Sequence, residues 1–209
     1  MNSTRILAQL KGRKPTIMGI EELRTSAVLL PLINVKNEVH VLFETRSMNL
    51  RRQPGDICFP GGRIESTDQG PLQCAIRETA EELGLQSSDI IDVTPLDYIV
   101  SDFGRMIYPY AGTITQPEKI TPNPHEVENV FTVPLRFFQQ TDPKRYNVSL
   151  RVTPEADFPF DLIVGGKDYN WQVPQVEELF YLYKDKVIWG LTAKIVTHFV
   201  SLLTEEHSS

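Results

Sequence analysis

FPGGRIESTDQGPLQCAIRETAEELGL, residues 59–85, is the stretch of this sequence that decides the fold. It contains a glycine turn, a loop and one short helix. Pro71 suits the first helical position, where a missing N–H costs little. Gly84 suits the left-handed position after the last turn, and Leu85 can fold back onto the helix. We therefore expect a helix over 71–83.

An acidic cluster marks this helix. At about 100° per residue, the face that we expect to be buried gathers Leu72, Ile76, Thr79, Ala80 and Leu83. The roughly opposite face gathers Glu78, Glu81 and Glu82. Like charges about 5 Å apart repel by roughly 1–3 kcal/mol at effective dielectrics of about 80 to 20, and the helix dipole disfavours acids near its C-terminus. A divalent cation would offset both costs, because hard cations take oxygen ligands. The alternative is a solvated acidic face.

The bulk properties fit one domain with a real core, since the 209 residues are 41% hydrophobic and 23% charged. We expect an N-terminal helix and linker over 1–25 and a single domain over 26–205. The net charge of −6 argues against nucleic acid as a partner. An anionic small-molecule substrate would then need local arginines and metal ions.

The expected location is the cytoplasm. The N-terminus lacks an apolar signal segment, residues 205–209 are not a peroxisomal tail, and no apolar run reaches the roughly 18 residues of a membrane span. Cys58 and Cys74 form no CxxC or zinc spacing, which is typical of a protein in a reducing compartment.

The remaining chain alternates strands and helices. We expect helices over 3–10, 134–140 and 189–203, and strands over 26–33, 39–44, 57–59, 92–100, 106–115 and 130–133, with a turn at 101–105. Pro31 predicts an edge or a bend in the first strand. Residues 146–183 are β-prone and aromatic. We expect their aromatic side chains in the core, the alternative being a substrate groove; they are Phe158, Phe160, Tyr169 and Trp171.

A basic segment, RSMNLRRQPGD at 46–56, precedes the glycine turn. Its Arg46, Arg51 and Arg52 form the densest positive patch in an acidic protein. Guanidinium groups match phosphate oxygens bidentately, so the segment is a candidate phosphate site; the alternative is a role in solubility. Gly61 and Gly62 allow the backbone to approach a ligand closely.

Residues 77–85, RETAEELGL, resemble the second half of the Nudix box, whose core is REuxEExGu with u apolar. Gly62 and Asp68 resemble its GX5E half. Two departures are visible: Asp68 stands for Glu, one residue further from Arg77 than usual, and Thr79 replaces an apolar residue. The acids of the helix are intact.

A second motif narrows the resemblance. Residues 46–62 fit RSx3Rx3Gx3FPGG without a gap, which is similar to the motif that marks coenzyme A diphosphatases within the Nudix superfamily. The usual preceding LLTx is less well kept, as Leu42-Phe43-Glu44-Thr45. Segments within 126–135 and 189–193 also resemble that subfamily.

The resemblance implies an α/β fold, an α/β/α sandwich around a mixed β-sheet. It also implies an enzyme that hydrolyses a pyrophosphate linkage with Mg2+ or Mn2+. For coenzyme A the products would be 3′,5′-ADP and 4′-phosphopantetheine. The oligomeric state stays open, with a homodimer among the alternatives.

Roles for individual residues follow from the same motifs. Cations held by Glu78 and Glu82, with Glu81 nearby, would neutralise the diphosphate and acidify a water nucleophile. Arg77 lies four residues before Glu81 and would orient a carboxylate. The general base is Glu81 or Glu126. Phosphate recognition falls to a group of arginines and glycines: Arg46, Arg51, Arg52, Gly61 and Gly62.

Two alternatives remain. One is a Nudix hydrolase of another nucleoside diphosphate derivative, such as ADP-ribose or NADH, against which the 46–62 motif argues. The other is a nucleotide-sensing module without turnover. Such a module predicts the loss of a helix carboxylate, and none is missing.

Overall fold

The structure is a computed structural model that describes residues 2–101 and 104–205. Its main sheet is mixed and eight-stranded, with the principal order β3-β2-β1-β7-β5; β4 pairs with β1, β6 with β7 and β8 with β2. The strands are β1 Arg24–Val35, β2 Glu38–Arg46, β3 Ile57–Cys58, β4 Gly61–Arg63, β5 Ile90–Pro95, β6 Ile99–Ser101, β7 Arg105–Ile114 and β8 Val127–Pro134. A second sheet, in the order β11-β10-β9, comprises β9 Lys144–Ser149, β10 Gln175–Tyr183 and β11 Lys186–Trp189.

Four α-helices accompany the sheets: α1 Ser3–Ala8, α2 Pro71–Leu83, α3 Leu135–Gln140 and α4 Gly190–Glu205. Short 3-10 turns lie at Ile20–Glu22, Ser87–Asp89, Pro117–Lys119, Phe160–Leu162 and Gly166–Asp168. The expected helices and most expected strands are present, with shifted ends. The single strand expected over 92–100 is wrong, because β5 ends at Pro95 and β6 begins at Ile99. The expected turn at 101–105 includes residues 102–103, which lie outside the described residues. No helix in the described ranges is long and apolar enough to cross a membrane.

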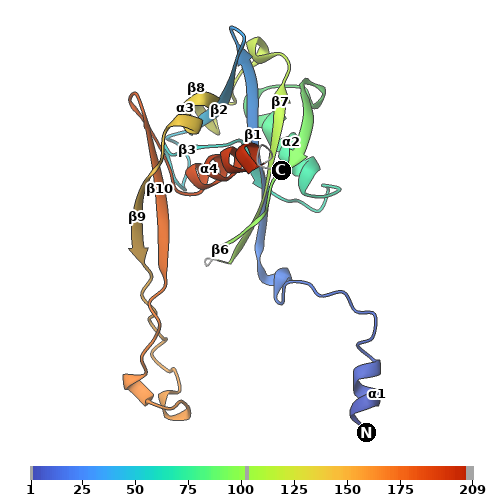
Figure 1. The fold of residues 1–209 in the computed structure, drawn as a ribbon, viewed down its shortest axis with the longest axis vertical. Helices are drawn as coiled ribbons and strands as arrows, with labels where there is room; N and C mark the ends of the chain where they lie inside the picture. The colour runs from blue at the N-terminus through green and yellow to red at the C-terminus, as the bar shows by residue number, and fades with distance from the viewer. Residues whose placement is uncertain (1, 102–103, 206–209) are drawn as a thin grey trace.

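Strand β1 is the centre of the main sheet (Figure 1). Along one side it pairs in parallel with β7, and along the other it pairs antiparallel first with β4 and then with β2. The β1–β2 hairpin turns through Lys36 and Asn37, whose φ angles of 49° and 66° match a type I′ turn. The expected glycine turn is wrong as a turn, because Gly61 and Gly62 lie in β4 and pair with Val28 and Ala27 of β1. The name glycine turn is kept below for residues 59–62.

Pro31 was predicted to mark an edge or a bend. It lies inside β1 opposite Gly112 of β7, so the edge is not found there, and the bend stays a prediction. The position of Pro31 is explained by a change of neighbouring strand, from β4 to β2, on the side of β1 away from β7. The N–H of Leu29 donates to the carbonyl of Pro60 at 2.9 Å, and residue 31 faces the same way by strand alternation. The pairing with β4 ends at Val28 and that with β2 begins at Leu32, so the missing N–H of Pro31 falls in the gap between the two partners.

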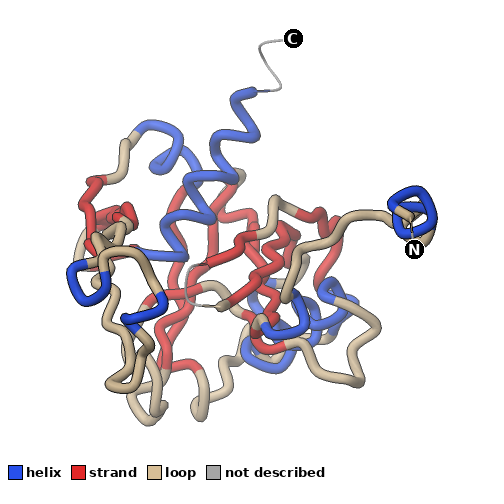
Figure 2. The backbone as a smooth tube through the Cα atoms, turned by 90° about the horizontal axis from the view of Figure 1, so that it is seen from below, coloured by secondary structure: helices blue, strands red, loops and turns tan. Residues whose placement is uncertain are grey.

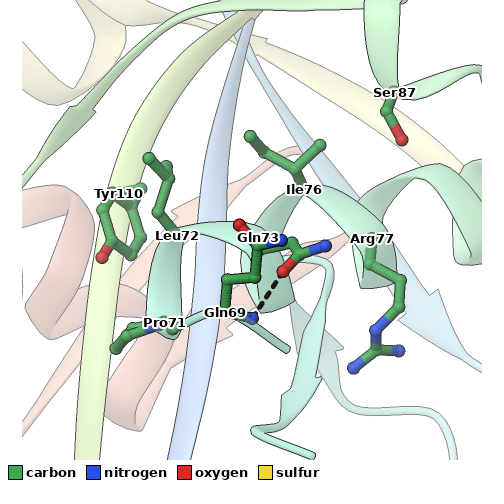
Figure 3. A pocket seen from close by; sticks show the side chains of 9 residues that line it. Gln69, Pro71, Leu72, Gln73, Ile76, Arg77, Ser87 and Tyr110 are labelled. Atoms are coloured by element: carbon green, nitrogen blue, oxygen red, sulfur yellow. Dashed lines mark hydrogen bonds between the residues drawn. The ribbon is translucent and has the colours of Figure 1, made fainter. Parts of the chain in front are cut away.

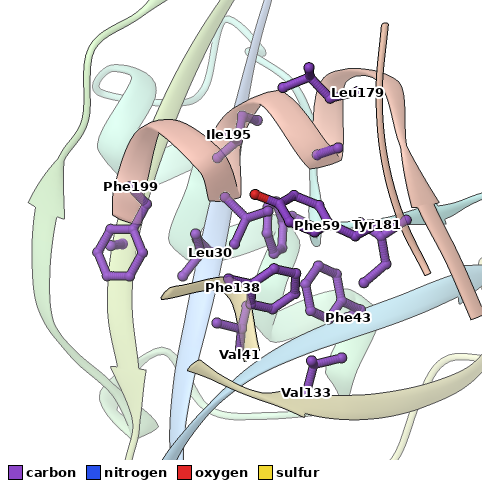
Figure 4. Close-up of a cluster of buried hydrophobic side chains, with 14 residues drawn as sticks. Leu30, Val41, Phe43, Phe59, Val133, Phe138, Leu179, Tyr181, Ile195 and Phe199 are labelled. Carbon is purple, nitrogen blue, oxygen red and sulfur yellow. The ribbon is translucent and has the colours of Figure 1, made fainter. Parts of the chain in front are cut away.

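Helices cover both faces of the sheet (Figure 2). On one face, α3, α4 and the β10–β11 hairpin enclose the largest core cluster, in which Phe43, Phe138 and Tyr181 are fully or almost fully buried (Figure 4). On the other face, Cys74, Ala75 and Leu83 of α2 pack against the sheet. The expected α/β/α sandwich around a mixed sheet is confirmed.

Strands β9 and β10 lead out of the sandwich into an arm, defined here as residues 150–174 between them (Figure 1). At its far end Phe158 lies 5.0 Å from Phe160 and 5.8 Å from Trp171, between ring centroids, and Trp171 lies 4.9 Å from Tyr169. None of these four rings belongs to the buried core. The expectation that they pack in the core is wrong, because they contact one another at the end of the arm.

Candidate active site

Helix α2 begins and ends as its sequence predicts. Pro71 occupies its first turn, Gly84 follows its last turn with φ 65°, and the Leu85 N–H donates to the Ala80 carbonyl at 2.9 Å. The predicted buried face is wrong in part. The buried residues are Cys74, Ala75, Thr79, Glu82 and Leu83, whereas Leu72 is 42% exposed. One of the helix acids therefore lies within the interface with the sheet.

The glycine turn leaves room for two acids of α2 in this interface. The Gly61 N–H donates to Glu82 Oε2 at 2.8 Å. A Cβ on Gly62 would lie 2.3 Å from the Glu78 carboxyl carbon. Any larger residue at position 62 would displace that carboxylate. The turn and α2 thus form one unit, in which backbone of β4 faces the carboxylates of Glu78 and Glu82.

Arg77 joins three carboxylates at the edge of this unit. It forms a bidentate ion pair with Asp68, at 2.9 and 3.0 Å, and also contacts Glu78 at 3.0 Å and Glu81 at 3.3 Å. The hydrogen bonds from Arg77 lower the pKa of Asp68 to about 2. Arg77 therefore orients carboxylates, and Asp68, to which the sequence assigned no role, holds Arg77.

Glu126 is held above the end of α2 by its loop. The Asn123 N–H donates to the Glu82 carbonyl at 2.8 Å, and the Asn123 side chain donates to Glu126 Oε2 at 3.3 Å. Ser47, which is fully buried, donates its N–H to the Glu126 carbonyl at 2.8 Å and its hydroxyl to Pro124. A residue of the 46–62 motif therefore fixes the position of an acid 79 residues away.

Glu44 of β2 is a further acid at this site, and no role for it was predicted from the sequence. It is 1% exposed, and its Oε1 accepts a hydrogen bond from the Cys58 thiol at 3.2 Å. The available signal was a single charged residue at the end of an otherwise apolar run, Val41-Leu42-Phe43.

Mutual repulsion and burial shift the acids toward their protonated forms. Burial, followed by the charge of Glu44, raises the pKa of Glu82 to about 9. Burial also raises the pKa of Glu44 to about 7, against the Cys58 hydrogen bond. The pKa of Glu78 is raised by burial as well, although Arg77 opposes the shift. The charge of Glu126 adds to all three shifts.

Of the three predicted phosphate-binding arginines, one lies beside the acids. Burial raises the pKa values of Glu44 and Cys58, and the charge of Arg46 opposes both shifts. Arg46 Nε is buried without a hydrogen-bond partner in the described structure. Arg46 also closes the motif loop, since its N–H donates to the Asp56 carbonyl at 2.9 Å. Arg51 and Arg52 are exposed on that loop.

These residues fit a divalent cation by their chemistry. The donors are carboxylates, and Glu44 Oε2 is a buried oxygen without a hydrogen-bond partner in the described structure. Across residues 2–101 and 104–205, no three acidic, His or Cys side chains converge into a ready-made metal cage. Repulsion among the acids opposes such convergence until a cation neutralises them.

A surface depression of about 710 Å³ lies elsewhere on α2 (Figure 3). It is lined by Gln69, Gly70, Pro71, Leu72, Gln73, Ile76, Arg77, Ser87 and Tyr110. It shares only Arg77 with the acid cluster and holds no acidic side chain. The acids that face the glycine turn, where charge and burial are concentrated, are therefore the candidate site.

The model of the NUDIX domain matches residues 23–152 of the chain. The chain belongs to the Nudix family. As a member it is a Nudix diphosphatase, and α2 is the helix of its Nudix box.

Similar proteins support this membership over most of the chain. The peroxisomal coenzyme A diphosphatase NUDT7 of Mus musculus is 27% identical over 186 residues, covering 86% of this chain and 70% of its own. The mitochondrial coenzyme A diphosphatase NUDT8 of Homo sapiens is 29% identical, covering 86% and 69%. The Nudix hydrolase NudL of Pectobacterium atrosepticum is 29% identical, covering 87% and 84%.

Among solved structures, a MutT/nudix family protein from Enterococcus faecalis has the same fold. The TM-score is 0.52 at 15% identity, over 98% of this chain and 70% of the other. The agreement shows that the two chains share a fold.

Proposed function

We propose that this Nudix enzyme hydrolyses the pyrophosphate linkage of coenzyme A or its derivatives, giving 3′,5′-ADP and 4′-phosphopantetheine. One observation carries the proposal. The gapless RSx3Rx3Gx3FPGG motif ends in Gly61 and Gly62, and these glycines face the carboxylates of Glu82 and Glu78. Two similar proteins are coenzyme A diphosphatases by name, which supports the same substrate class here.

The proposed cofactor is Mg2+ or Mn2+, held by Glu78 and Glu82 with Glu81 nearby. When bound, such a cation neutralises diphosphate oxygens and lowers the pKa of a water nucleophile. The chain's own residues hold these carboxylates in position. Arg77 fixes the directions of the Glu78 and Glu81 carboxylates, and the Gly61 N–H fixes Glu82.

The general base is Glu81 or Glu126, and the geometry favours Glu126. The Glu81 side chain is 56% exposed and paired with Arg77. Glu126 is tied through Asn123 to the end of α2, and its charge acts on Glu78 and Glu82. A base must reach the water that attacks the phosphorus, and Glu126 enters the acid cluster from a separate loop.

Substrate recognition is assigned to the arginines of the motif loop. Arg46, Arg51 and Arg52 would bind the diphosphate and the 3′-phosphate by charge-assisted hydrogen bonds. Gly61 and Gly62 would let the substrate approach the backbone. The proposed catalytic domain spans residues 26–205, and the proposed location is the cytoplasm, consistent with the free thiols of Cys58 and Cys74.

A substrate panel tests the proposal. Coenzyme A, dephospho-coenzyme A, ADP-ribose and NADH are each incubated with the full chain and Mg2+ or Mn2+, and the products are separated by chromatography. We expect coenzyme A to have the highest kcat/KM. Turnover of ADP-ribose alone would overturn the substrate assignment, and no turnover of any compound would favour a nucleotide-sensing module.

A further inference from the structure

Glu44 occupies a position where the coenzyme A diphosphatase motif has a neutral residue. The chain reads Leu42-Phe43-Glu44-Thr45 where the motif reads LLTx, so Glu44 stands for the threonine. Neither the Nudix box nor the motif assigns a function to an acid at this position.

Strand alternation directs Glu44 toward α2. Phe43 points into the large core beneath α4, whereas Leu42 packs with Leu83 at the end of α2. Side chains two residues apart share a face, so Glu44 lies on the α2 face with Leu42.

The surroundings of Glu44 leave half of its carboxylate unsatisfied. Its Oε1 accepts the Cys58 thiol, which is a weak donor. Its Oε2 has no hydrogen-bond partner in the described structure, and the whole residue is 1% exposed. Arg46 is the cation whose charge acts on Glu44, but no ion pair between Arg46 and Glu44 is present in the described residues. Buried carboxylates are normally paired, hydrogen-bonded or bound to a metal.

Two buried carboxylates therefore reach the same short segment, residues 58–61, Glu44 from β2 and Glu82 from α2. Glu82 receives one hydrogen bond from the Gly61 N–H, and Glu44 receives one from a thiol. Neither arrangement neutralises a second negative charge. A divalent cation between them would do so and would use the free oxygen of Glu44.

We propose that Glu44 is an additional carboxylate ligand of the divalent-cation centre, contributed by β2. The inference rests on the proposed function, which supplies the cation. The competing explanation is that Glu44 serves only as the acceptor for the Cys58 thiol.

Mn2+ binding to the metal-stripped full chain tests the inference, followed by electron paramagnetic resonance of free Mn2+ at pH 8. The variants are Glu44→Gln, which keeps the shape, and Glu44→Thr, which restores the motif residue. The control is Glu128→Gln, an exposed acid of β8. We expect both Glu44 variants to weaken Mn2+ binding roughly 10-fold or more, and the control to bind as the native protein does.

A fourth variant, Cys58→Ala, separates the two roles of Glu44. It removes the thiol and keeps the carboxylate, so Mn2+ affinity should be retained. Native affinity in both Glu44 variants, or an equal loss in Cys58→Ala, would overturn the inference. If the native protein itself binds no Mn2+, the proposed metal-dependent function fails instead, so the two failures are distinguishable.

Discussion

Glu82 is a carboxylate whose surroundings favour protonation when no cation is present. Burial raises its pKa from 4.5 to about 9. The folded protein therefore binds more protons than the unfolded chain between these pH values, and the contribution of Glu82 to stability falls as pH rises through that window. A cation bound at the site would favour the deprotonated form of Glu82 instead, because metal ligation requires a carboxylate.

Glu82→Gln should therefore separate activity from stability. We expect kcat to fall by about 100-fold or more, beyond the roughly 10- to 100-fold typical of residues that only support a ligand. The metal-free variant should melt at the same temperature as the native protein or slightly higher, and the difference should be larger at pH 8 than at pH 5. Steady-state kinetics and calorimetry at both pH values measure this, with Glu128→Gln as control. A large loss of stability with activity retained would show that Glu82 is structural.

Gly62→Ala tests the contact between the glycine turn and Glu78. The added Cβ would lie 2.3 Å from the Glu78 carboxyl carbon, so the carboxylate must move. We expect kcat to fall about 100-fold, since small misplacements of catalytic groups are costly. In the double variant Gly62→Ala/Glu78→Gln the two losses should not add, because both act on one carboxylate. Additive losses would mean that Gly62 acts independently of Glu78.

At the level of single residues, the sequence predicted the acids of the helix better than the residues around them. The Glu78–Glu82 pair and Arg77 followed from spacing along one helix. Asp68 and Glu44 did not, because their roles depend on partners brought together by the fold: the Arg77 fork and the Cys58 thiol. The sequence does place Arg51 in the motif, but its contribution to substrate binding depends on the conformation of the loop that exposes it.

The loop between β2 and β3 is the element to which we assign substrate choice. It is closed at its base by Arg46 and Asp56, and it exposes Arg51. Arg51→Ala should weaken coenzyme A more than dephospho-coenzyme A, because the charge-assisted contact to the 3′-phosphate is lost. The ratio of the two kcat/KM values measures this, with the exposed Arg24 changed to alanine as control. Equal losses for both substrates would show that Arg51 does not read the 3′-phosphate.

Among the elements, α2 shows what local sequence can and cannot predict. Pro71 and Gly84 set its ends, since both act through backbone conformation. Its buried face could not be predicted from residue polarity alone. The partner at that face is a pair of glycines, which leaves room for the Glu78 side chain and supplies a backbone N–H to Glu82.

For the whole molecule, the layered architecture was predicted through the family resemblance, whereas the arm was not. Nothing local distinguishes aromatic rings that pack on a core from rings that pack on one another, as Phe158 and Trp171 do. The arm also leaves apolar side chains in solvent, including Leu162 at 78% and Val164 at 95% exposure. Exposed apolar surface of this kind is typical of an interaction site.

The open strand β9 and the exposed arm support the hypothesis of a homodimer. All six residues of β9 are exposed, and its outer edge is unpaired in the described sheet. Light scattering after size-exclusion chromatography should give twice the mass of one chain. Leu162→Ser/Val164→Ser should shift that mass toward the monomer while leaving the circular dichroism spectrum unchanged. A native protein that elutes as a monomer at micromolar concentration would contradict the hypothesis.

We propose that the acids of α2, with a divalent cation, cut the diphosphate of coenzyme A. The proposal is tested by the conversion of coenzyme A by the native protein and by Glu82→Gln, each with Mg2+ and with Mn2+. We expect 3′,5′-ADP and 4′-phosphopantetheine in equal amounts from the native protein, no products when the metal is chelated, and almost none from the variant. Undiminished release of 3′,5′-ADP by Glu82→Gln, or intact coenzyme A with the native protein and both metals, would contradict it.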